Sequence, residues 1–116
     1  MLNVEEAVIA HLRSLGFDAR ADAPAKRPDS FVTVERVGGA STENVLDRAV
    51  LAVQCWAPTR LAASQLAIAV DVAMRGVTAT DGVCEYARQS MYNFPDPDSR
   101  QARYQLTCEV VALREE

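Results

Sequence analysis

The chain has 116 residues, a length typical of one domain with a modest core, and 49% of its residues are hydrophobic while 24% are charged. No run of 18 or more apolar residues occurs, and the first residues lack a basic region, so we expect neither a membrane span nor a secretory signal. The net charge of −4 disfavours tight binding to duplex DNA, which depends on Lys and Arg. We therefore expect a protein that stays in the cytoplasm where it is made.

Seven elements are predicted from periodicity and turn residues. A helix is expected where Asn3 and Glu6 resemble a capping box and apolar residues follow at helical spacing up to Gly16. A second helix is expected after Pro58 and Thr59, with Thr59 as N-cap. The strands show alternating or β-branched residues. In chain order, the predicted elements are a helix at 4–15, a short edge strand at 17–21, strands at 31–37 and 47–56, a helix at 61–75, and strands at 82–91 and 102–113.

The order α-β-β-β-α-β-β predicts one α+β domain over residues 1–116. Its core would be a mostly antiparallel sheet of four to five strands with two helices packed on one face. For the second helix we expect an apolar stripe that faces the sheet. This stripe comprises Ala62, Leu66, Ala69, Val70 and Ala73, widened by Leu61, Ile68 and Val72.

The segment Gly38 to Asn44 is predicted to be a flexible connection, too long for a tight two-residue hairpin. It does not match the phosphate-binding loop G-x-x-x-x-G-K-[ST], because no second glycine and no lysine follow at the required spacing. The strands on either side place Phe31, Val50, Ala52 and Trp56 on the face away from the helices. That face is either buried against a neighbouring subunit or covered by loops of the same chain.

No set of residues with catalytic spacing is found. His11 is the only histidine and is expected at the edge of the core, and the three cysteines are expected to be small buried side chains. Asp96 and Asp98 lack the rest of a calcium-binding loop and are interpreted as a solvated turn. We therefore expect no enzymatic activity and no catalytic, cofactor or metal site.

Three pieces of sequence resemble one family. They are R-P-x-x-F-V-x-V-x-R-x-G-G from Arg27 to Gly39, D-R-x-x-L-x-V-x-C-W-A from Asp47 to Ala57, and P-D-P-D-S-x-x-x-R-Y-Q from Pro95 to Gln105. With the Ala-rich helix after Pro58, their order and spacing resemble the tail terminator, or tail completion, proteins of long-tailed bacteriophages, particularly those of actinobacterial phages and prophages. The resemblance spans most of the chain.

The resemblance implies a structural virion protein made in the bacterial cytoplasm. Such proteins form a homo-hexameric ring on the head-proximal end of the tail tube, end polymerisation of the major tail tube protein and present the docking surface for the head–tail connector. DNA would pass through the ring without specific binding. No cofactor and no membrane are implied.

On this resemblance we expect the hairpin region to form the assembly interface, with its loop becoming ordered on binding. Arg36 and Arg48 would pair across subunits. The expected interface residues are Arg36, Gly38, Gly39, Ser41, Thr42, Glu43, Asn44, Arg48 and Trp56. The expected lumen-facing acids are Glu35, Glu43 and Asp47. The alternative is a small cytoplasmic binding module or a dimeric α+β enzyme, with a pocket between the sheet and the second helix.

Overall fold

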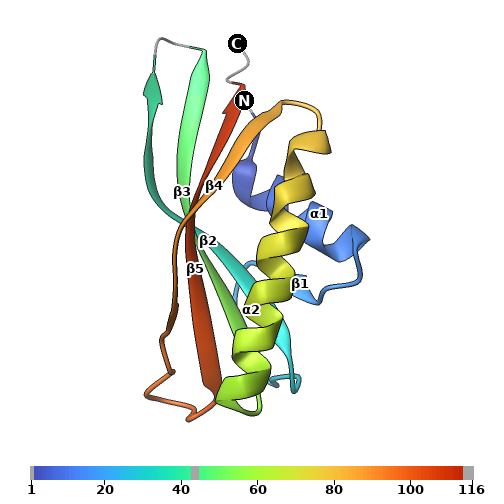
Figure 1. The fold of residues 1–116 in the computed structure, drawn as a ribbon, viewed down its shortest axis with the longest axis vertical. Coiled ribbons are helices and arrows are strands. Elements are labelled where there is room, and N and C mark those ends of the chain that lie inside the picture. Colours follow the sequence, from blue (N-terminus) through green and yellow to red (C-terminus); the bar gives the residue numbers. More distant parts are fainter. Residues whose placement is uncertain (1, 43–44, 114–116) are drawn as a thin grey trace.

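The computed structural model describes residues 2–42 and 45–113, except for the side chains of Ser41 and Thr42. It confirms the predicted α+β class: two α-helices lie on one face of a five-stranded sheet with the order β1-β2-β3-β5-β4 (Figure 1). All strand pairs are antiparallel except β1 with β2. The elements are α1 (Val4–Ser14), β1 (Ala19–Arg20), β2 (Phe31–Thr42), β3 (Leu46–Ala57), α2 (Arg60–Met74), the 3-10 helix η1 (Arg75–Ala79), β4 (Val83–Asn93) and β5 (Ala102–Leu113).

Both helices begin where the sequence predicts. The Asn3 side chain accepts a hydrogen bond from the backbone N–H of Glu6, and the Thr59 hydroxyl accepts one from that of Ala62. Each cap satisfies a donor that has no partner within the helix. Gly16 follows α1 with a φ of 95°, a left-handed conformation that glycine adopts without steric cost. These local signals fix where the helices start because they involve neighbouring residues only.

The core lies between the helices and one face of the sheet. The helix-facing side chains of the central strand β3 are Ala49, Leu51, Val53 and Cys55, and all four are fully buried. Residues of β5 with the same alternation, from Leu106 to Ala112, join them in the same cluster. Each buried large aliphatic side chain contributes about 1.5–3 kcal/mol relative to an exposed one. In both strands, every second residue faces the helices, as predicted.

The face of α2 that packs on the sheet overlaps the predicted one only in part: Val70 is buried, and Leu66 and Ala73 are half-buried against the core. The buried residues are Ala63, Ala67, Val70, Asp71 and Met74. Three large apolar residues expected to widen the buried stripe, Leu61, Ile68 and Val72, are instead 67%, 57% and 58% exposed. Because α2 is apolar on nearly all sides, its periodicity does not define one face. Small side chains on the buried side let the helix lie close to the sheet.

The helical stretch 60–79 is also long and apolar enough, by length and composition, to cross a membrane. A core helix of a soluble protein passes the same test. In this fold the α2 part of the stretch covers the sheet, with Ala67 and Val70 fully buried in the core.

The β2–β3 hairpin is longer than predicted. The pairing of β2 with β3 continues to Thr42 opposite Leu46, so Gly38 to Thr42 lie in a strand and not in a flexible connection. The register shifts between Arg36 and Gly38, which marks a β-bulge with Val37 as the extra residue. Gly38 and Gly39, which resemble loop residues in the sequence, directly follow this bulge within the strand. The predicted loop residues Glu43 and Asn44 lie outside the described residues.

Smaller differences between the predicted and the observed elements occur after α2 and in β4. The 3-10 helix η1 follows α2 directly, and the strand predicted at 82–91 runs from Val83 to Asn93. Cys55 and Cys108 are buried as predicted, but Cys84 is exposed on the edge strand β4. An edge strand lacks a neighbour on one side, so a small apolar residue in it need not be buried.

Candidate functional site

An ion pair holds the bulged part of the hairpin. Nη1 and Nη2 of Arg36 each lie 2.7 Å from a carboxylate oxygen of Asp47, and Nε of Arg36 donates to the carbonyl oxygen of Gly38. The Asp47 side chain is only 3% exposed. The hydrogen bond to Asp47 is the main cause that raises the pKa of Arg36. This bidentate pair spans the two strands and fixes their register.

The pair corrects two expectations. Asp47 was expected to face a ring lumen, but it is buried within its own chain. Arg36 was expected to pair with a neighbouring subunit, yet its guanidinium already binds Asp47. The sequence does not reveal this, because the bulge at Val37 changes which residues share a face. After the bulge, the position opposite Asp47 is Ser41, and the long Arg36 side chain reaches Asp47 diagonally.

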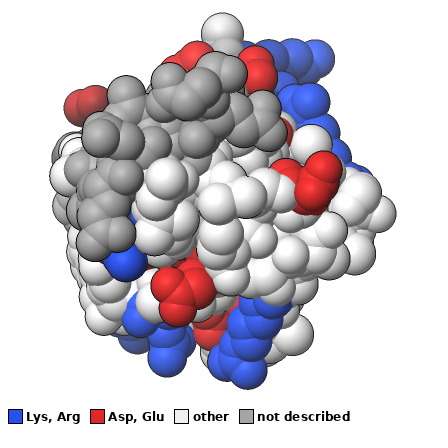
Figure 2. Space-filling view, turned by 90° about the horizontal axis from the view of Figure 1, so that it is seen from above, with Lys and Arg blue, Asp and Glu red and all other residues white. Residues whose placement is uncertain are grey.

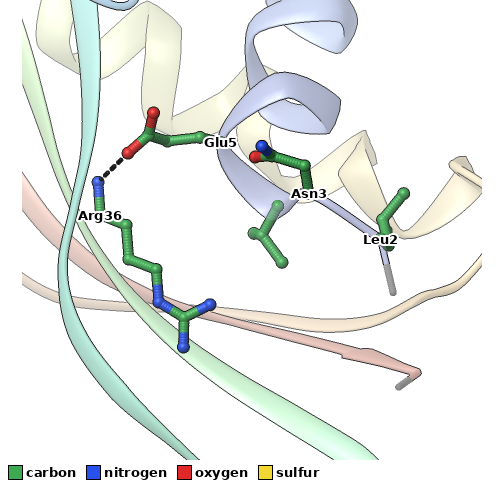
Figure 3. A pocket seen from close by; sticks show the side chains of 5 residues that line it. Leu2, Asn3, Glu5 and Arg36 are labelled. Atoms are coloured by element: carbon green, nitrogen blue, oxygen red, sulfur yellow. Dashed lines mark hydrogen bonds between the residues drawn. The ribbon is translucent and has the colours of Figure 1, made fainter. Parts of the chain in front are cut away.

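A cavity of about 370 Å³ lies where α1 begins, beside β2. It is lined by Leu2, Asn3, Val4, Glu5 and Arg36 (Figure 3). The Glu5 carboxylate accepts a 2.7 Å hydrogen bond from the backbone N–H of Arg36, drawn as the dashed line in Figure 3. This N–H lies on the edge of β2 beyond the two residues that β1 covers. Glu5 therefore satisfies one backbone donor on an otherwise open strand edge.

Trp56 lies in a buried cluster on the sheet face away from the helices. Its ring stacks on Phe31 with a centroid distance of 5.2 Å, and its indole N–H donates to the hydroxyl of Thr33 at 3.1 Å. The guanidinium groups of Arg27 and Arg103 lie 4.8 and 4.9 Å from the ring centroid. Trp56 is 4% exposed. The same chain thus covers this end of the face, and Trp56 is not an exposed assembly contact.

The remaining expected interface residues and the expected lumen-facing Glu35 are distributed along the hairpin. Glu35 is exposed on the face away from the helices, whereas Arg48 forms a 3.4 Å ion pair with Glu109 of its own chain. Gly38 and Gly39 are in the bulged part of β2. Ser41 and Thr42 are in the strand, their side chains outside the description, and Glu43 and Asn44 lie outside the described residues. The structure therefore brings these residues onto one hairpin but engages both arginines internally.

Three exposed apolar residues lie on the hairpin and on the strand beside it. Val37, Val45 and Leu113 are 55%, 51% and 48% exposed. The hairpin and the end of β5 extend past the helices at this end of the molecule (Figure 1). Figure 2 looks onto that end and shows uncharged residues over much of the described surface, with charged side chains around them. The sequence signal for Val37 is a valine next to two glycines, which identifies a bulge only after the pairing is known.

A second hollow, of about 340 Å³, lies between α2–η1 and the edge strand β4. Asp71, Arg75, Tyr86 and Arg88 line it. The Tyr86 hydroxyl donates to one Asp71 carboxylate oxygen at 2.7 Å, and burial is the main cause that raises the pKa of this hydroxyl. None of these four residues is identified from the sequence as part of a site. Asp71 interrupts an apolar helix, and the sequence pattern assigns it no role.

His11 and Asp96, for which the sequence predicts no chemical role, have structural partners, and Asp96 is buried and not solvated as predicted. The His11 Nε2 atom lies 2.7 Å from the carbonyl oxygen of Ala73 in α2. Asp96 accepts hydrogen bonds from the Ser99 hydroxyl and the Asp98 backbone N–H, and the first of these is the main cause that lowers its pKa. Within residues 2–42 and 45–113 no group of three potential metal ligands is found.

Comparison of the sequence with protein-family models and with curated proteins finds no match.

Proposed function

We propose that this chain is a ring-forming structural protein of the tail-terminator type. In this proposal, six copies cap the head-proximal end of a bacteriophage tail tube, stop addition of the major tail tube protein and offer a surface to the head–tail connector. The ring would be assembled in the bacterial cytoplasm and retained in the virion, with DNA passing through its lumen. The sequence resemblance supplies the class of protein.

The observation that carries the proposal is the exposed apolar end of the hairpin. Val45 and Leu113 each leave about half of their surface in water and lie near one another, because Leu46, next to Val45, pairs with Leu113; Val37 is similarly exposed further along the hairpin, at the bulge. Exposed apolar residues that gather at one end of a small protein are typical of a protein–protein contact. In the ring, this end would contact the tube or a neighbouring subunit. Glu35 is exposed on the face of β2 that points away from the helices, and it stays a candidate for the lumen wall.

The alternative is a binding module or a dimeric enzyme with a pocket between the sheet and α2. One observation favours it: the hollow lined by Asp71, Arg75, Tyr86 and Arg88 lies between α2 and β4, where the alternative places a pocket. Its lining contains an acid, two bases and a phenol, which are groups that can bind a polar ligand. We develop this hollow separately below, because a partner site there is compatible with a ring.

The proposal is tested by electron microscopy of the negatively stained protein, alone and mixed with tail tubes that lack a terminator. We expect six-fold rings or tubes capped at one end. The double variant Val37→Lys and Val45→Lys should fold normally, because both positions are exposed, and should lose capping. Leu15→Lys is the matched control: Leu15 is also 55% exposed but lies at the end of α1, and this variant should cap normally.

Two results would overturn the proposal. The first is a wild-type protein that forms no ring and leaves cognate tubes uncapped and of uncontrolled length. The second is a double variant that caps as well as the wild type, which would remove the hairpin end from the contact.

A further inference from the structure

The hollow between α2 and β4 has an unusual balance of charges. The Asp71 carboxylate comes from the buried side of α2 and is 8% exposed. One of its oxygens accepts from Tyr86, and the other lies 3.4 Å from Arg75 Nη2 and 3.7 Å from Arg88 Nη1. Two guanidinium groups from different elements thus converge on one carboxylate oxygen. The local net charge of the three ionised groups is +1.

The two arginines retain most of their hydrogen-bonding capacity. Each guanidinium has five N–H donors, and within the described residues each makes only the contact to Asp71. The Arg75 and Arg88 side chains are 69% and 44% exposed, so these donors face water. Asp71, held by Tyr86, acts as a positioning residue that keeps both guanidiniums at the same hollow. A second carboxylate could accept from both of them.

The hollow lies beside an open strand edge. β4 is the last strand of the sheet, so the backbone groups that point away from β5 have no strand to pair with. Register shifts occur between Val83 and Glu85 and between Arg88 and Ser90. The two shifts divide the pairing of β4 into short regular stretches, and the one that contains Arg88 runs from Glu85 to Arg88, which limits the length of any strand that could be added there. Arg88 lies on the helix side of this stretch, opposite the buried Cys108.

We propose that this hollow binds the carboxylate of one Glu or Asp from a short extended segment of a partner protein, which pairs with β4. On an added strand, the residue opposite Arg88 would have its Cβ about 5 Å from that of Arg88 and on the same face. An acidic side chain there reaches both guanidiniums. A single carboxylate carries one negative charge and matches the +1 of the hollow, whereas a phosphate dianion would overcompensate it beside Asp71.

A second copy of this chain does not supply the acid through the open part of its β2 edge. The helix-facing residues of β2 before its bulge are Val32, Val34 and Arg36, and none is acidic. We assign the acid to another protein, such as one that docks on the assembled ring. The inference does not depend on ring formation, because the hollow lies within one chain.

The test is an NMR titration of the full chain with ¹⁵N-labelled arginine and backbone amides. The probe is the peptide acetyl-Thr-Val-Glu-Val-Thr-amide, compared with the same peptide carrying Gln and with inorganic phosphate. We expect the Nε–H signals of Arg75 and Arg88 and the amides of Glu85 to Arg88 to shift with the Glu peptide. The Gln peptide should bind about tenfold more weakly, as expected on loss of a charge-assisted hydrogen bond.

Two variants and a control sharpen the test. Arg88→Gln should weaken binding of the Glu peptide about tenfold and make the Glu and Gln peptides equivalent. Arg20→Gln is the control, because Arg20 lies on β1 at the opposite sheet edge and forms an exposed pair with Asp18, which precedes β1, so this variant should leave binding unchanged. Asp71→Asn raises the local charge to +2 and should shift the preference toward phosphate.

The proposal is overturned if both peptides bind wild-type protein equally, or if phosphate binds more tightly than the Glu peptide. It is also overturned if the shifts fall outside β4 and the two arginines. If rings form normally but the peptide does not bind, this site is rejected and the tail-terminator proposal stands. If the peptide binds but no rings form, the tail-terminator proposal is rejected and this site stands.

Discussion

Replacing Trp56 by alanine distinguishes a core role from an assembly role. Trp56 is 4% exposed, stacks on Phe31, donates to Thr33 and has the guanidiniums of Arg27 and Arg103 over its ring. Loss of a buried aromatic ring costs about 3–5 kcal/mol of unfolding free energy. Each lost cation–π contact adds about 0.5–1 kcal/mol. Since a domain of this size has a total stability of about 5–15 kcal/mol, Trp56→Ala should leave it marginally folded.

The assay is urea unfolding followed by circular dichroism, because the substitution removes the only tryptophan as a fluorophore. Trp56→Phe is the matched control: it keeps a ring against Phe31 and loses the N–H donor, so we expect a cost of about 1 kcal/mol from the hydrogen bond plus a small packing loss. The reasoning is refuted if Trp56→Ala costs less than about 1 kcal/mol while abolishing ring formation, since only an exposed contact residue would behave in that way.

Three further predictions concern the hairpin and the thiols. Gly39→Ala should destabilise the fold by about 1–3 kcal/mol in the same unfolding assay, because φ is 117° and an added Cβ would overlap the Arg48 carbonyl oxygen, whereas Gly38→Ala has space and should be nearly neutral; equal costs would contradict the bulge geometry. Cys84 alone should react rapidly with a thiol reagent in the native state. Burial raises the pKa of the thiols of Cys55 and Cys108 to about 12 from 9.0, so the unfolded chain loses these protons first and stability should fall as the pH rises from about 9 toward 12. A double Cys-to-Ala variant should lose this part of the pH dependence.

The fold class followed from the sequence because its signals are local. Helix caps at Asn3 and Thr59 depend on residues three positions apart, and alternation in β3 and β5 depends on a period of two. The bounds of β5 agree with the predicted range 102–113. Alternating and β-branched residues at 31–37 and 47–56 likewise placed β2 and β3 in the correct order.

The candidate site was less accessible from the sequence. The β2–β3 hairpin was predicted to contain a flexible loop because its glycines resemble turn residues, yet Gly38 and Gly39 pair with β3 directly after the bulge at Val37. Asp71 gave no signal as part of a site, because its partners Tyr86 and Arg88 lie 15 and 17 positions away on a different element.

The sequence by itself therefore determined the elements, their order and the core face of the central strands, since backbone sterics and hydrophobic period act over a few residues. Only the tertiary structure decided which side of α2 faces the sheet, that Trp56 and Asp47 are buried, and that two arginines share the Asp71 carboxylate. These features arise from contacts between residues distant in the chain. Their energies depend on the position of a bulge and on the packing of small side chains, which a periodic pattern does not specify.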